Sequence, residues 1–125
     1  SDVYKRQEEG SRQRREALFR TGLEAYSRGE WREAARAFAK VEADDPYYQD
    51  VHYMRRTAAL YADLSSRDRS RRASAAQQLG EVGDLVCWDP LIDALGDPSP
   101  RVADAAERAF QQIGPQTLDG PVGRW

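Results

Sequence analysis

The sequence predicts an all-α fold built from helical hairpins, and three features of the chain support this class. Apolar residues recur at three- and four-residue spacing, which is the period of one face of an α-helix. Glycine and proline separate these stretches where tight turns are expected. No stretch alternates apolar and polar residues strictly enough to predict a β-strand.

Two helices are expected before Pro46. The first begins near Ala17 and ends at Gly29, because glycine commonly terminates helices. The second begins at Trp31 and ends just before Pro46, since proline disfavours helical conformation in the preceding residue. Together they would form a hairpin with a very short turn.

The rest of the chain is also expected to be helical. Further helices are predicted over residues 48–64, 70–79, 90–95 and 100–113. Asp89 suits the cap of the third of these, with Pro90 at its first position, and Ser99 suits the cap of the fourth. The expected domains are an N-terminal arm (1–14), a hairpin plus capping helix (15–64), further repeats (65–114) and a flexible tail (115–125).

The first residues of the chain look unlike the remainder. Residues 2–7 resemble one translated frame of a transposon-end adapter used to tag DNA for sequencing. We therefore expect residues 1–14 to be an artefactual or disordered arm, with a genuine polar arm as the alternative. A targeting segment or further repeats before residue 8 would then be missing.

The composition excludes several classes of protein. With 40% hydrophobic and 32% charged residues, the chain has enough apolar material for a core. The single cysteine, Cys87, allows no internal disulfide, which slightly favours a reducing compartment such as the cytoplasm. No apolar run is long enough for a membrane span.

Charge is distributed unevenly along the chain. Residues 55–72 carry six arginines against two acids, whereas residues 81–125 carry eight acids against three arginines. The simpler interpretation is two solvated faces of opposite sign, and the alternative is a face that steers a charged partner. The net charge of −2 gives no overall field that would favour nucleic acid.

The stretch from Leu18 to Pro46 resembles a tetratricopeptide (TPR) repeat. The matching residues are Leu18, Gly22, Tyr26, Gly29, Trp31, Ala34, Phe38 and Pro46. Gly22 and Ala34 are small where two helices would approach closely, while Trp31 and Phe38 would fill the groove between helices. A 34-residue shift places Arg56 where Gly22 stands, so the next unit is expected to be a single capping helix.

The C-terminal half resembles short bacterial HEAT-like repeats, including the phycobilisome-lyase type. The matches to one second helix and its exit are Ala73, Ala75, Ala76, Leu79, Gly80, Val82, Gly83 and Asp84. The matches to the next repeat are Pro90, Leu91, Ile92, Ala94, Leu95, Asp97, Val102, Ala105, Ala106, Ala109, Phe110, Ile113 and Gly114. An offset of 31 pairs Leu79 with Phe110 and Gly83 with Gly114, which indicates an internal repeat. The resemblances imply an α-solenoid, TPR-like and then HEAT-like.

One position departs from the HEAT-like pattern. The arginine expected near the start of the second helix is present as Arg72, but Ala103 takes the equivalent place in the next repeat. The departure leaves open whether Asp97 receives an arginine.

The residues offer little for catalysis. His52 is the only histidine, and with Cys87 as the only cysteine there is no metal-ligand spacing and no clear nucleophile–base pair. The glycines at 80 and 83 flank acids that would repel phosphate. We therefore expect no enzyme activity, no metal, no cofactor and no small-molecule substrate.

The leading hypothesis is a protein–protein interaction scaffold, a fragment of a larger bacterial repeat protein. In TPR-like proteins the first helix of each hairpin lines a concave face, which could hold a protein or peptide. The residues expected on that face are Phe19, Leu23, Tyr26, Asp50, Tyr53 and Thr57. Phe19 and Leu23 could instead pack on an upstream repeat.

Two alternatives remain at this point. The HEAT-like resemblance implies a relative or subunit of a chromophore lyase, although fold analogy alone is weak evidence for activity. The stretch Arg67–Arg72 could contact a nucleic-acid backbone, but the acidic C-terminal half and the lack of interleaved aromatic residues argue against it.

Overall fold

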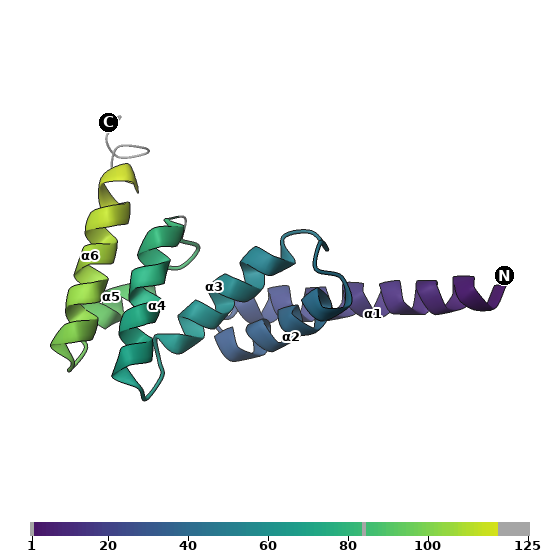
Figure 1. The fold of residues 1–125 in the computed structure, drawn as a ribbon, viewed down its shortest axis with the longest axis horizontal. Helices are drawn as coiled ribbons and strands as arrows, with labels where there is room; N and C mark the ends of the chain where they lie inside the picture. Colours follow the sequence, from purple (N-terminus) through teal and green to yellow (C-terminus); the bar gives the residue numbers. More distant parts are fainter. Residues whose placement is uncertain (1, 84, 118–125) are drawn as a thin grey trace. The chain divides into compact units, whose positions relative to one another are not determined.

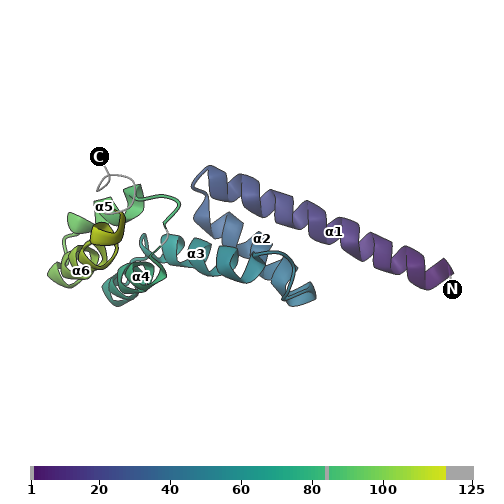
Figure 2. The same ribbon diagram turned by 90° about the horizontal axis from the view of Figure 1, so that it is seen from above.

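The computed structural model describes residues 2–83 and 85–117, and every regular element in these ranges is an α-helix (Figures 1 and 2). The helices are α1 (Asp2–Ser27), α2 (Trp31–Asp44), α3 (Val51–Asp63), α4 (Arg69–Val82), α5 (Asp89–Leu95) and α6 (Pro100–Thr117). The chain divides into two compact units, unit 1 (Ser1–Ala59) and unit 2 (Leu60–Trp125). The all-α class predicted from the sequence is confirmed.

In unit 1, α1 and α2 form the predicted hairpin. Gly29 adopts a left-handed backbone conformation (φ +75°) that residues with a side chain rarely accept, which allows the tight turn. The second helix ends at Asp44, and Asp45 is extended ahead of Pro46, as the proline requires. Both ends of the hairpin therefore follow from local sequence.

The core of unit 1 is aromatic. The Phe38 ring is fully buried against Gly22, where a β-carbon would lie only 2.5 Å from the ring. Phe19 packs on Phe38 with ring centroids 5.5 Å apart, and Tyr26 meets Trp31 edge-on at 5.1 Å. The small residue at position 22 therefore creates the space that an aromatic ring occupies.

The first helix is longer than the sequence predicts. Residues 2–14 continue α1 as a largely exposed helix, and the expectation of an artefactual or disordered arm, with its resemblance to an adapter, stays a prediction. Glutamate, glutamine and arginine favour helix, and Arg12 pairs with Glu9 at 3.5 Å. Gly10 has nothing within 4 Å of its β position, so it does not mark a contact.

In unit 2, α4 packs along α6, and α5 packs on α6 (Figure 1). Its core consists mainly of small and aliphatic side chains: Ala73, Ala76, Leu91, Ala94, Val102, Ala106, Ala109 and Ile113. A β-carbon on Gly80 would lie 2.9 Å from the Ala109 backbone, so α4 and α6 are in direct contact there. Trp88 stacks on Phe110 at the edge of this core.

The 31-residue offset appears in the backbone of unit 2. Arg69 and Pro100, the first residues of α4 and α6, are separated by this interval. Two turns at the same offset repeat one hydrogen bond: Asp68 N–H donates to Ser66 Oγ, and Ser99 N–H donates to Asp97 Oδ1. The internal similarity of the sequence therefore corresponds to a repeated local structure.

Two helix ends in unit 2 differ from expectation. Trp88, not Asp89, occupies the cap position of α5, and it makes no side-chain capping hydrogen bond. Gly83 ends α4 in a left-handed conformation (φ +77°), whereas its equivalent Gly114 lies inside α6, which continues to Thr117. Residues 115–117 of the expected tail therefore belong to α6, and residues 118–125 lie outside the described part of the chain.

Candidate functional site

Three of the six residues expected on a partner-binding face are buried. Phe19, Tyr26 and Thr57 are between 2% and 8% exposed. The Tyr26 hydroxyl lies 3.1 Å from the Thr57 hydroxyl, which also donates to the Tyr53 carbonyl at 3.0 Å. Tyr26 and Thr57 connect α1 to α3, and Phe19 packs on Phe38 of α2, so all three contribute to the core of unit 1, and their role in binding a partner stays a prediction.

The other three residues lie at the surface of unit 1. Asp50 is exposed, and Leu23 and Tyr53 keep 41% and 37% of their surface exposed. The Phe19–Tyr48 ring contact (5.2 Å) and the Tyr26–Thr57 hydrogen bond bracket these positions along the two segments. Leu23 and Tyr53 therefore flank these two contacts, which form a row that connects α1 to α3 and to the turn before α3.

We name Leu23, Asp50 and Tyr53 the α1/α3 surface. It combines an aliphatic side chain on α1, an amphipathic aromatic ring on α3 and a carboxylate in the turn before α3. Such side chains suit contact with another protein, because aromatic anchors bury much area with few rotatable bonds.

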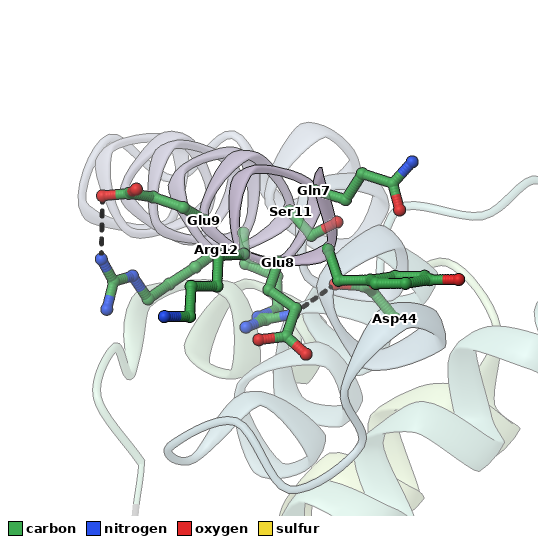
Figure 3. A pocket seen from close by; sticks show the side chains of 9 residues that line it. Gln7, Glu8, Glu9, Ser11, Arg12 and Asp44 are labelled. Atoms are coloured by element: carbon green, nitrogen blue, oxygen red, sulfur yellow. Dashed lines mark hydrogen bonds and ion pairs between the residues drawn. The ribbon is translucent and has the colours of Figure 1, made fainter. Parts of the chain in front are cut away.

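A hollow lies beside the N-terminal half of α1 (Figure 3). It has a volume of about 710 Å³ and is lined by Tyr4, Lys5, Gln7, Glu8, Glu9, Ser11, Arg12, Arg15 and Asp44. Arg15 donates to Asp44 at 2.8 Å, and this hydrogen bond raises the pKa of the Arg15 guanidinium. Most of its wall is exposed polar helix, so the hollow does not converge on a reactive group.

Unit 1 also contains a polar cluster around Glu42. Its carboxylate is 2.7 Å from His52 Nδ1 and 2.5 Å from Arg55 Nε. The hydrogen bond with His52, followed by that from Arg55, holds the pKa of Glu42 below its ordinary value. The cluster ties α2 to α3 on the outside of the unit, and its histidine is thereby committed to a structural contact.

The other candidate for covalent chemistry, Cys87, lies in unit 2. It is half-buried, and its backbone N–H donates to the Tyr61 hydroxyl at 3.2 Å. Over the described ranges, no group of three or more His, Cys, Asp and Glu side chains could hold a metal ion. Each helix that the structure describes is too short or too polar to cross a lipid bilayer.

The arginine-rich stretch Arg67–Arg72 is divided between two roles. Arg72 donates to both carboxylate oxygens of Asp97, at 2.9 and 3.1 Å, and to the Ser66 carbonyl at 2.8 Å. This contact lowers the pKa of Asp97. Arg72 thus links the equivalent turns of the two repeats, while Arg67, Arg69 and Arg71 are exposed.

The sequence left the partner of Asp97 open, and it did not indicate that polar residues of α4 and α6 line a common surface. These polar residues are Gln77, Glu81, Arg108 and Gln112. The arginine for Asp97 comes from Arg72 in the preceding repeat, so Ala103 does not break the contact. The signal for these polar residues was already in the 31-residue offset, which applies to exposed positions as well as buried ones.

Comparisons with known proteins found no family model, no curated protein and no solved structure that matches this chain.

Proposed function

We propose that this chain is a protein-interaction module built from stacked helical hairpins, TPR-like and then HEAT-like. The observation that carries the proposal is the α1/α3 surface, where exposed Leu23 and Tyr53 flank a buried row. An apolar side chain and an aromatic one on rigid helices are typical anchors for a partner protein. Because the helices are already ordered, binding costs little conformational entropy.

The packing of small residues supports the repeat assignment. Gly22, Ala34, Ala75 and Ala106 are all buried at the positions where helices of such repeats touch. Stacked hairpins of this kind form a curved solenoid with an extended concave face. The α1/α3 surface would belong to that face, with a protein or peptide as its occupant.

The proposal is tested by capture and then by direct binding. The tagged chain captures proteins from a bacterial lysate, and a captured protein is purified and titrated against the chain. The variant pair Leu23→Ala with Tyr53→Ala should weaken binding by about tenfold or more, since each anchor contributes on the order of 1 kcal/mol.

A control pair on the exposed side of α2, Arg32→Ala with Arg36→Ala, should leave the affinity unchanged. Circular dichroism should show the same helix content for all variants, because the substituted side chains are at the surface. Equal affinity for the parent chain and the Leu23/Tyr53 pair would contradict the assignment of this surface.

A further inference from the structure

A groove runs between α4 and α6 on the surface of unit 2. It has a volume of about 290 Å³ and is lined by Gln77, Glu81, Ala105, Arg108, Ala109 and Gln112. Its floor is made of small side chains, because Gly80 and Ala109 bring the two helices into contact beneath it. Its rim is polar.

Five of the lining residues, Gln77, Glu81, Ala105, Arg108 and Gln112, belong to two rows of equivalent positions in the internal repeat. Ser70, Ser74 and Arg101 extend these rows beyond the lined groove, toward the first residues of α4 and α6. The 31-residue offset pairs Ser70 with Arg101, Ser74 with Ala105, Gln77 with Arg108 and Glu81 with Gln112. Within each helix these positions are spaced by four, three and four residues, so they occupy a single face. The Arg101 guanidinium lies 3.4 Å from Ser70 Oγ, which joins the two rows at the N-terminal ends of the helices.

Two arginines give this face its charge. Arg101 and Arg108 are seven residues apart on α6, so about 10.5 Å separates them along the helix axis. Both are exposed, and within the described part of the chain no carboxylate forms an ion pair with either. The exposed Arg69 and Arg71 add positive charge at the start of α4, while Glu81 lies at the other end of the groove.

We propose that the groove binds an extended acidic peptide segment of a partner protein, with two carboxylates three residues apart that pair with Arg101 and Arg108. In the polyproline II conformation, residues three apart point the same way and are about 9.3 Å apart, which the long arginine side chains can accommodate. Each guanidinium can bind a carboxylate through two parallel hydrogen bonds. The inference rests on the proposed interaction function.

The remaining lining residues fit such a peptide. The amides of Gln77 and Gln112 can donate to and accept from a peptide backbone, which is fully solvated in this conformation. Glu81 repels a carboxylate at its end of the groove and so places the acidic residues toward Arg101. None of the described residues that line the groove is aromatic, so they provide no stacking platform of the kind found in single-strand nucleic-acid sites.

The test uses the full ¹⁵N-labelled chain and the peptide PPEPPEPP, whose glutamates are three residues apart. At about 1 mM peptide, backbone NMR signals of Gln77, Arg108 and Gln112 should shift, with an affinity at least tenfold above that of PPQPPQPP. The peptide PPEEPPPP, of equal composition, should bind more weakly than PPEPPEPP. Arg101→Gln and Arg108→Gln should each weaken binding at least fivefold, and Glu81→Gln should strengthen it.

Arg32→Gln, on the exposed side of α2, is the matched control and should bind as the parent chain does. Equal binding of PPQPPQPP, or no shift of the groove signals, would overturn the proposal. Larger shifts of the same signals by a single-stranded DNA oligonucleotide would overturn the peptide as the occupant. If the acidic peptide does not bind the groove but a partner protein still binds through Leu23 and Tyr53, only this inference is refuted. If the peptide binds but substitution of Leu23 and Tyr53 does not weaken partner binding, only the α1/α3 surface is refuted.

Discussion

Units 1 and 2 bring helices together in opposite ways. In unit 1 a ring fills the space between α1 and α2, since Gly22 faces the buried ring of Phe38. In unit 2 no side chain separates α4 from α6 at Gly80, because its β position lies 2.9 Å from the Ala109 backbone. Gly22 thus makes room for the side chain of Phe38 between two helices, whereas Gly80 allows the backbones of two helices to approach each other directly.

The difference predicts how stability is distributed. Burial in unit 1 is concentrated in a few large aromatic side chains, each of which contacts several others. Between α4, α5 and α6 of unit 2, burial is spread over many alanines and aliphatic side chains, and a polar link between Arg72 and Asp97 joins the two repeats. A single substitution should therefore damage the packing of α1 on α2 more than the packing of α4 on α6.

The largest effect is expected for Phe38→Ala. Removing this fully buried ring should destabilise unit 1 by about 3–5 kcal/mol, since it leaves a cavity between Gly22, Phe19 and Tyr26. Urea unfolding followed by Trp31 fluorescence, in a background with Trp88→Phe and Trp125→Phe, measures this unit. Phe110→Ala in unit 2 should cost less, because that ring is only partly buried; equal losses would refute the contrast.

The next effect is expected at the link between the repeats of unit 2. Arg72→Met should cost about 2–3 kcal/mol, because it leaves the Asp97 carboxylate without its charged partner in a site where that side chain is 11% exposed. Adding Asp97→Asn should recover part of the loss, and the double-mutant cycle gives the coupling energy. A loss below about 0.5 kcal/mol would show that the alanine contacts alone hold the repeats together.

A smaller effect separates the two roles of glycine in unit 2. Gly80→Ala should destabilise by about 1 kcal/mol net, because overpacking against the Ala109 backbone outweighs the gain in helix propensity. Gly114→Ala should have the opposite sign and stabilise by roughly 0.5–1 kcal/mol, since nothing lies within 4 Å of its β position inside α6. The melting temperatures of both variants, compared with that of the parent chain, test these opposite signs. A higher melting temperature for Gly80→Ala would refute direct contact between the helices.

Local sequence was enough to predict the helices, their main breaks and the small residues at their contacts. It could not predict which of two overlapping stripes on α1 faces inward. Phe19 and Tyr26 share a face with both Gly22 and Leu23, and only the position of α2 decides that Gly22 lies inside and Leu23 outside. Phe19 and Tyr26, two of the residues expected on the partner surface, lie in the core of unit 1 for this reason.

The polar contacts show a second limit of sequence reasoning. A repeat comparison aligns Arg72 with Ala103, but Arg72 reaches forward to Asp97 in the next repeat, so the contact spans the boundary that the alignment draws. The groove between α4 and α6 has the same origin, because its lining appears only when exposed residues of both repeats face one side. Contacts between residues of two repeats depend on how the helices lie against each other, and the 31-residue offset alone does not specify this arrangement.

The smallest effect is a loss of stability in acid, which both units should share. The pKa of Glu42 is lowered by His52 and Arg55, and that of Asp97 by Arg72 and the Ser99 N–H. Below the ordinary carboxyl pKa of about 4, these two carboxylates are therefore protonated in the unfolded chain while they are still ionised in the folded chain, so the free energy of unfolding decreases as the pH is lowered.

Urea midpoints measured from about pH 5 to pH 2 should show a shallower dependence on pH for Asp97→Asn in unit 2 and for Glu42→Gln in unit 1. The change should be larger for Asp97, whose side chain is 11% exposed against 22% for Glu42, because solvent screens the less buried pair more strongly; slopes equal to that of the parent chain would show that neither pair contributes to folding.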